Sequence, residues 1–235
     1  SRVRRMYQDV FQPQVEWLTN KFAWYGTTQR FDCLTLTFRE NEHGAFVAHH
    51  YRYSSSMSTF VVECDEATWR RAGLDRMGDE DSRAYCERVF APDLDRHPLV
   101  SNKSIWRQFP ILHNRRWSHG NAVLIGDALR TMHFSIGSGT RLAFEDAIAL
   151  DRAFAEANED VPAALAAFER ERRPVVEKLF AAANASSYWY EKFPGKMRQF
   201  DALGLAYDYM TRSGRMSDQR LAESAPQFMT RVNAK

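Results

Sequence analysis

The residues best suited to chemistry lie in residues 121–150, where an apolar run meets a carboxylate and a glycine-containing loop. Residues 122–125 are aliphatic and do not alternate with polar residues, which is typical of a strand covered on both faces. Such a strand delivers Asp127 to its carboxyl end, where open α/β sheets bind ligands. The Asp127 carboxylate can accept hydrogen bonds from ligand hydroxyl groups, so the segment suits a polyhydroxylated ligand.

An amphipathic helix is predicted to begin at residues 137–140, which read Gly-Ser-Gly-Thr. Gly137 and Gly139 leave room for a ligand to approach the backbone, and Ser138 and Thr140 are candidate caps of the helix. The N–H groups at a helix start carry roughly half a positive charge, which favours an electron-rich ligand group. The alternative is an ordinary strand, turn and capped helix in a core, and these residues alone leave both open.

This segment as a whole resembles a known motif. Its features follow one another in the order strand, Gly-Asp-Ala, linker, Gly-x-Gly and Leu-Ala-x-Glu-Asp-Ala. It is similar to the second FAD motif of the flavin-dependent aromatic monooxygenases, the p-hydroxybenzoate hydroxylase class. The resemblance implies that Asp127 binds the flavin ribitol and that residues 137–140 form the wall beside the isoalloxazine ring. The cofactor-binding residues expected here are Gly126, Asp127, Arg130, Gly137, Ser138, Gly139 and Thr140.

The segment departs from the common family version, which reads Gly-Asp-Ala-Ala-His, then a Pro-Pro pair, then Gly-Gln-Gly. This chain has Leu129-Arg130 and then His133-Phe134-Ser135. In that respect it resembles the branch that hydroxylates aromatic acyl-CoA thioesters, such as the salicylyl-CoA and anthraniloyl-CoA hydroxylases. The resemblance makes His133 and Ser135 candidate catalytic residues, although a loop histidine can instead cap a backbone group.

The first residues, Ser-Arg-Val-Arg, resemble the end of another family motif that contacts the FAD pyrophosphate and the pyridine nucleotide. Arg4 is therefore a further candidate cofactor-binding residue, and the alternative for so short a basic stretch is a solvated terminus. No Gly-x-Gly-x-x-Gly follows a strand, so the usual first βαβ unit for a dinucleotide is missing from these residues. We interpret the chain as a C-terminal portion of a monooxygenase domain.

Between these motifs, the pattern predicts an antiparallel meander with strands at residues 31–38, 45–53 and 59–64, and a further strand at residues 101–109. Acidic starts predict helices at residues 65–71 and 79–90. This order resembles the substrate domain of the same hydroxylases, in which a sheet lies over the flavin. Aromatic and histidine side chains suit an aryl group, although an aromatic side chain on a strand more often packs in the core. The candidate substrate residues are Trp24, His49, Tyr51 and Trp106.

The C-terminal third is predicted to begin with a long helix from Val161, with Pro162 in its first turn and an apolar stripe through Leu165, Phe168, Leu179 and Phe180. Its Phe-Glu-Arg-x-Arg-Arg-Pro resembles a family helix signature, whose arginines either form a structural face or hold CoA phosphates. Residues 210–235 are polar and are interpreted as a tail or linker.

The fold class expected is α/β (α+β), a p-hydroxybenzoate-hydroxylase-like FAD-binding fold without its N-terminal βαβ unit. The expected segments are the end of a first FAD segment (1–20), a substrate sheet domain with helices (21–112), a returning FAD segment (113–160), C-terminal helices (161–209) and the tail (210–235).

Composition excludes some classes. The 32 basic and 30 acidic side chains nearly cancel, which argues against a nucleic-acid partner. No apolar run approaches the ~18 residues that span a bilayer, so we expect no membrane association and a cytoplasmic location. Cys33, Cys64 and Cys86 form no Cys-x-x-Cys and are predicted to be core thiols. The histidines lack metal-ligand spacing, because adjacent His49 and His50 point to opposite strand faces.

The resemblance implies an enzyme of aromatic catabolism in which NADH or NADPH reduces FAD, and O2 then gives a flavin C4a-hydroperoxide that hydroxylates an aromatic or aryl-CoA substrate. A fused reductase domain or a homo-oligomer is a further expectation of the same resemblance. Two alternatives stay open: a flavoprotein of this fold with another reaction, such as a reductase or halogenase, and a non-catalytic remnant. We expect the 235 residues alone to be inactive, because the adenosine half of FAD has no site in them.

Overall fold

The computed structural model describes residues 1–158 and 160–234, which form two compact units. The sheet unit comprises Thr19–Phe109 and Phe193–Arg198. The helix-rich unit comprises Ser1–Leu18, Pro110–Lys192 and the described residues from Gln199 onward. The expected antiparallel meander therefore falls within one unit, and the Gly-Asp segment falls within the other.

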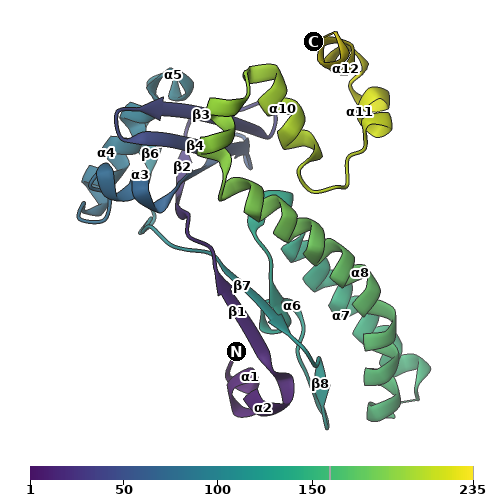
Figure 1. The fold of residues 1–235 in the computed structure, drawn as a ribbon. Helices are drawn as coiled ribbons and strands as arrows, with labels where there is room; N and C mark the ends of the chain where they lie inside the picture. Colours follow the sequence, from purple (N-terminus) through teal and green to yellow (C-terminus); the bar gives the residue numbers. More distant parts are fainter. Residues whose placement is uncertain (159, 235) are drawn as a thin grey trace. The chain divides into compact units, whose positions relative to one another are not determined.

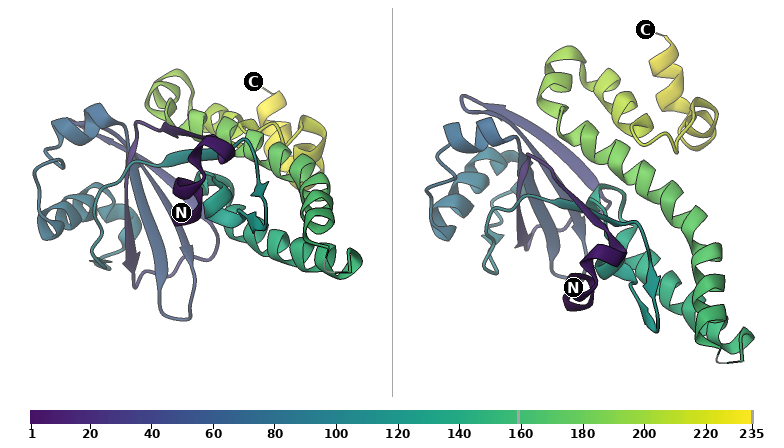
Figure 2. Two further views of the ribbon diagram at one scale, coloured as in Figure 1. Left: turned by 90° about the horizontal axis from the view of Figure 1, so that it is seen from below. Right: turned by 60° about the horizontal axis from the view of Figure 1, so that its bottom comes forward.

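The sheet unit is built on a five-stranded antiparallel sheet with the order β3-β4-β5-β2-β6. Its strands are β2 Lys21–Thr27, β3 Thr35–Asn41, β4 Gly44–Arg52, β5 Ser58–Cys64 and β6 Leu99–Val100. Its helices are α3 Glu66–Arg71, α4 Asp79–Val89, α5 Ala91–Leu94 and α9 Phe193–Gln199, of which Gln199 belongs to the other unit. Figure 2 shows α3 and α4, in blue, on one side of the sheet. The core of this unit contains Tyr25, Phe46 and Phe60 from the sheet together with Tyr85 and Phe90.

The prediction of a strand at residues 101–109 was wrong. Only Phe22 and Arg107 form a bridge there, exchanging two backbone hydrogen bonds of 2.9 Å. Ser101 and Ser104 account for the difference, because the Ser101 hydroxyl accepts from the Ser104 N–H and the Ser104 hydroxyl donates to the Trp24 carbonyl. Side-chain bonds of this kind stabilise a turn in place of a ladder.

The helix-rich unit combines two small antiparallel sheets with helices. One sheet has the order β1-β7-β10 and the other pairs β8 with β9. The strands are β1 Pro13–Trp17, β7 Pro110–Asn114, β8 Ser118–His119, β9 Ala122–Val123 and β10 Arg130–Thr131. The helices are α1 Arg2–Met6, α2 Gln8–Phe11, α6 Gly126–Leu129, the 3-10 turn η1 Phe134–Ile136, α7 Gly139–Glu156, α8 Val161–Tyr190, α10 Ala202–Thr211, α11 Asp218–Ser224 and α12 Pro226–Asn233. Helices α7 and α8 run side by side (Figure 1).

Helix α8 begins as predicted. Asp160 caps its N-terminus by accepting from the Ala163 N–H, and Pro162 lies in the first turn, where its missing N–H leaves no hydrogen bond unmade. Phe168 is fully buried and Leu165 and Leu179 are nearly so, which confirms the predicted apolar stripe. Pro174 lies inside the helix.

Three other expectations were wrong. Residues 122–125 do not form a strand covered on both faces, because only Ala122–Val123 are a strand, in a two-stranded ribbon. The described part of residues 210–235 is not a tail, since α11 and α12 each bury one apolar side chain, Leu221 and Met229; Lys235 lies outside the described residues. Cys33 is exposed, whereas Cys64 and Cys86 are core thiols as expected.

His50 is an ionisable side chain in the core of the sheet unit. Its ring stacks on Phe60 at 5.2 Å and lies 3.8 Å from Phe31, and its Nε2 hydrogen-bonds the Thr37 hydroxyl at 2.9 Å. Burial, which removes water from the charged form, lowers the pKa of His50 to about 4. The side chain is therefore a neutral core histidine at neutral pH.

We predict that His50 makes the fold acid-sensitive. The folded-state pKa lies below the unfolded value of about 6.5, so the unfolded chain binds the proton first and stability falls as pH drops from about 6.5 toward 4. Between pH 7 and pH 5 the unfolding free energy of the wild type should fall by on the order of 2 kcal/mol more than that of His50→Gln, measured by urea unfolding. Equal losses in the two proteins would contradict this assignment.

Candidate functional site

Asp127 lies in the first turn of the short helix α6, not at the end of a strand. Gly126 immediately before it has φ +53, a conformation that side chains disfavour, and a Cβ added there would lie 3.2 Å from the Ala143 Cβ. Glycine therefore serves both the turn and the close approach of α6 to the first turns of α7. The Asp127 side chain is exposed, which leaves its carboxylate available to a ligand.

Arg4 joins the start of the chain to this segment. Its Nη1 donates to the Ala128 carbonyl at 2.8 Å, across 124 residues of sequence. Arg4 lies in α1, whose N-terminus is capped by the Ser1 hydroxyl. The structure thus brings together the two short motifs that the sequence placed far apart.

The loop that precedes α7, residues 133–138, turns inward. His133 is buried, its Nδ1 accepts from the Ser135 N–H at 3.3 Å, and its ring lies 4.1 Å from Phe134 and 5.7 Å from Tyr190. The Ser135 hydroxyl lies 2.8 Å from that of Ser186 in α8. This geometry supports the backbone-capping alternative for His133, so catalytic roles for His133 and Ser135 stay predictions.

The N-terminus of α7 has no side-chain cap, contrary to the expectation for Ser138 and Thr140. The Ser138 hydroxyl instead donates to the Ile136 carbonyl at 3.2 Å. A Cβ added at Gly137 or Gly139 would meet nothing within 4 Å, so open space adjoins the loop. Uncapped N–H groups at a helix start can hold an electron-rich group, and the exposed Asp127 carboxylate can hold hydroxyl groups, so the residues present fit a flavin nucleotide.

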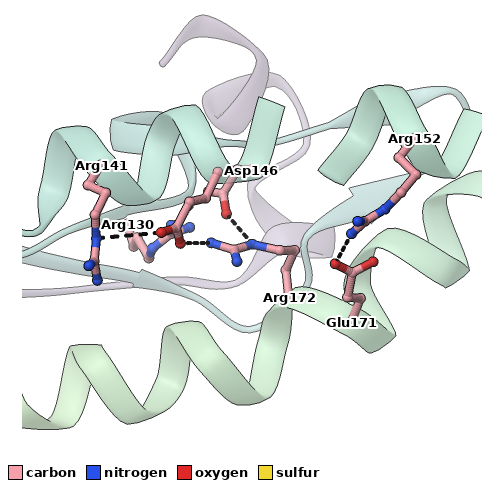
Figure 3. Close-up of polar contacts among 7 residues, drawn as sticks. Arg130, Arg141, Asp146, Arg152, Glu171 and Arg172 are labelled. Carbon is pink, nitrogen blue, oxygen red and sulfur yellow. Dashed lines mark hydrogen bonds and ion pairs between the residues drawn. The ribbon is translucent and has the colours of Figure 1, made fainter. Parts of the chain in front are cut away.

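Below this surface lies a buried ion network that the sequence analysis missed (Figure 3). Asp146 in α7 is fully buried and accepts from Arg130 Nη2 at 2.7 Å and from Arg172 Nε at 3.1 Å. Arg172 Nη2 also donates to Glu145 at 2.9 Å. The sequence did carry a signal for this network. Asp146 lies among the apolar positions of one helix, and Arg172 lies on the apolar stripe of the next. Arg130 is therefore buried beside Asp146, which gives its predicted cofactor contact little support.

The candidate substrate residues divide between the two faces of the five-stranded sheet. The register puts Trp24, His49 and Tyr51 on one face, because Trp24 and His49 both pair with Val61 and Tyr51 lies two residues beyond His49. Trp106 packs against the core on the other side and donates to the Ser82 hydroxyl at 2.7 Å. The structure thus brings three of the four together.

The same face holds a buried pair that the sequence analysis did not single out. His49 Nε2 lies 3.4 Å from Glu63 Oε2, and Asn20 Nδ2 donates to Glu63 Oε1 at 2.8 Å. Both ionisable side chains are buried. A glutamate within the apolar strand β5 was the signal. His49 and His50 do point to opposite faces, as predicted. Among residues 1–158 and 160–234, no three His, Cys, Asp or Glu side chains gather as metal ligands.

The chain has the fold of the FAD-dependent monooxygenases of the p-hydroxybenzoate hydroxylase type. PqsL, a probable FAD-dependent monooxygenase from Pseudomonas aeruginosa, matches 80% of this chain and 53% of its own with a TM-score of 0.55 at 23% identity. A family model described as an FAD binding domain matches residues 18–183, and the chain belongs to that family. No helix in the described part of the chain is long and apolar enough to span a membrane.

Three curated relatives are similar over most of the chain. A salicyloyl-CoA 5-hydroxylase of a Streptomyces species is 45% identical over 91% of this chain and 43% of its own length. A protodeoxyviolaceinate monooxygenase of Chromobacterium violaceum is 42% identical over 81% and 51%. A 3-hydroxy-4-methyl-anthranilyl-[aryl-carrier protein] 5-monooxygenase of Streptosporangium sibiricum is 38% identical over 86% and 52%. The chain thus spans about half the length of the relatives it matches.

We predict that the Asp146 network carries much of the stability of the helix-rich unit. Asp146→Asn leaves two buried guanidinium groups facing a neutral amide, so the unfolding free energy should fall by about 3 kcal/mol. Glu171→Gln is the matched control, because the Arg152–Glu171 pair is about half exposed and should lose less than about 1 kcal/mol. Urea unfolding measures both, and equal losses would show that the buried network has no special weight.

Proposed function

We propose that this chain is part of an FAD-dependent monooxygenase that uses NADH or NADPH and O2 to hydroxylate an aromatic substrate. The observation that carries the proposal is the hydrogen bond from Arg4 to the Ala128 carbonyl, beside Asp127 and the uncapped start of α7. Both motifs resemble segments that bind the same FAD molecule, and that resemblance requires the two motifs to lie close together. The relatives named as monooxygenases support the same reading.

In this proposal the residues of the helix-rich unit bind and orient the cofactor. The Asp127 carboxylate accepts hydrogen bonds from ribitol hydroxyl groups, and Arg4 lies toward the pyrophosphate. The N–H groups of Gly139 and Thr140 face the pyrimidine end of the ring, where they stabilise developing negative charge. FAD, when bound, supplies the redox and oxygen chemistry, so no side-chain nucleophile is needed.

The substrate class we propose is an aryl thioester. Two of the relatives carry names in which the aromatic acid is joined to CoA or to an aryl-carrier protein, whereas the third does not. The His133-Phe134-Ser135 segment supports the same branch by resemblance. The half-exposed Trp24 and Tyr51 can stack on an aryl group, and His49, held beside Glu63, can bind its polar substituent.

Reductase or halogenase activity and a non-catalytic role remain alternatives. A cytoplasmic location, a fused reductase domain and a homo-oligomer stay predictions.

The first prediction from this proposal concerns the cofactor. In the full-length gene product, Asp127→Ala should raise the FAD dissociation constant roughly 10- to 100-fold, because it removes hydrogen bonds to a charged acceptor. Quenching of flavin fluorescence on titration measures this. Asp151→Ala, an exposed aspartate on α7, is the matched control and should bind like the wild type. A colourless wild type that takes up no FAD would sink the flavoprotein proposal.

The second prediction concerns the substrate. Salicyloyl-CoA or anthraniloyl-CoA should stimulate NADH or NADPH oxidation and gain one oxygen atom, whereas the free acids should not. Stopped assays with mass detection of the product measure both. Equal stimulation by the free acids would remove the thioester class while leaving the flavoprotein proposal in place.

A further inference from the structure

Arg212, the C-cap residue of α10, binds three separate parts of the helix-rich unit with one guanidinium group. Its Nε donates to the Ser186 hydroxyl at 2.8 Å, its Nη2 to the Ser135 carbonyl at 3.0 Å and its Nη1 to the Tyr209 carbonyl at 2.8 Å. Its Cζ lies 3.6 Å from the centroid of the Tyr209 ring. One side chain therefore ties the 133–138 loop, α8 and α10 together.

These contacts close a ring of hydrogen bonds. The Ser135 hydroxyl lies 2.8 Å from the Ser186 hydroxyl, so Ser135 is held through its side chain by α8 and through its carbonyl by Arg212. Ser186 itself is fully buried. Tyr190 adds an aromatic link, because its ring lies 5.7 Å from His133 and 5.8 Å from the Arg212 Cζ. The loop is thereby held at His133 and at Ser135.

Ser135 lies close to the start of α7, so the ring of hydrogen bonds affects how that helix begins. Only residues 136–138 separate Ser135 from Gly139, where α7 begins, and one of them is Gly137 with φ +61. A short loop with a left-handed glycine has little stiffness of its own. The direction in which the uncapped N–H groups of α7 point therefore depends on how firmly Ser135 is held.

We propose that Arg212 is a positioning residue for the cofactor site, acting through Ser135 and Ser186 to hold the loop from which α7 starts. The assignment rests on the proposed FAD-binding function and adds the C-terminal helix α10 to the elements that build the site. Arginine suits the task because its planar fork offers N–H groups in three directions at once, whereas a lysine ammonium on a flexible stem does not reproduce that fork.

The test uses the full-length protein and two readouts. Arg212→Lys keeps the charge and loses the fork, Arg212→Gln loses both, and Arg215→Gln removes an exposed arginine three residues along as the control. Amide hydrogen exchange without FAD, followed by mass spectrometry, should be about tenfold faster at residues 135–141 in both Arg212 variants and unchanged in Arg215→Gln. The FAD dissociation constant should rise about fivefold or more in the same two variants.

The outcomes distinguish the positioning role of Arg212, its link to the cofactor and the proposed function. Wild-type exchange at residues 135–141 in Arg212→Lys would overturn the positioning role, and faster exchange with unchanged FAD affinity would overturn its link to the cofactor. A wild type that binds no FAD, with exchange still faster in the variants, would instead defeat the proposed function alone. If the Arg212 variants fail to fold, Ser186→Ala removes the hydroxyl shared by Arg212 and Ser135 and should give the same change in exchange, to a smaller degree.

Discussion

The Asp146 carboxylate is buried without access to water, and an ionised group in such a place costs several kcal/mol unless its neighbours satisfy it. Arg130 and Arg172 do so, and they come from β10 and α8. Pairing one charge therefore fixes three elements of the helix-rich unit against one another. Domains are stable by only about 5–15 kcal/mol, so a contact whose loss costs about 3 kcal/mol is large enough to select one arrangement.

That arrangement decides where the candidate site can be. With α7 held against α8 along its middle, its N-terminus can lie only where the loop of residues 133–138 delivers it. The loop contains one 3-10 turn followed by the left-handed Gly137, so local geometry alone leaves it several paths. Contacts from Ser186, Tyr190 and Arg212 remove that freedom. The site is thus a surface feature whose geometry is set by helices that the ligand need not touch.

Motif and apolar pattern were enough to place the start of α7 and the strands β4 and β5, whereas Asp127, expected at the end of a strand, lies in the short helix α6. They could not show contacts that depend on distant residues. Arg130 occupies a motif position, yet a motif does not tell which way a side chain points, and the buried Asp146 draws it inward. The helices α11 and α12 were missed because each buries one apolar side chain, Leu221 or Met229, and short helices expose the rest. The polar residues there lie mostly on the outer surface of the helices, whereas the sequence analysis interpreted them as a tail or linker.

The two longest ties to the site share a chemical feature. Arg4 reaches Ala128 across 124 residues and Arg212 reaches Ser135 across 77, and both guanidinium groups donate to a backbone carbonyl. A bond to a carbonyl fixes the main chain and leaves the side chain at that position free to vary, because every residue type carries the same acceptor. Arg4 and Arg212 therefore hold the main chain on either side of residues 129–134, whereas Arg130 inside that span is held through its side chain by Asp146.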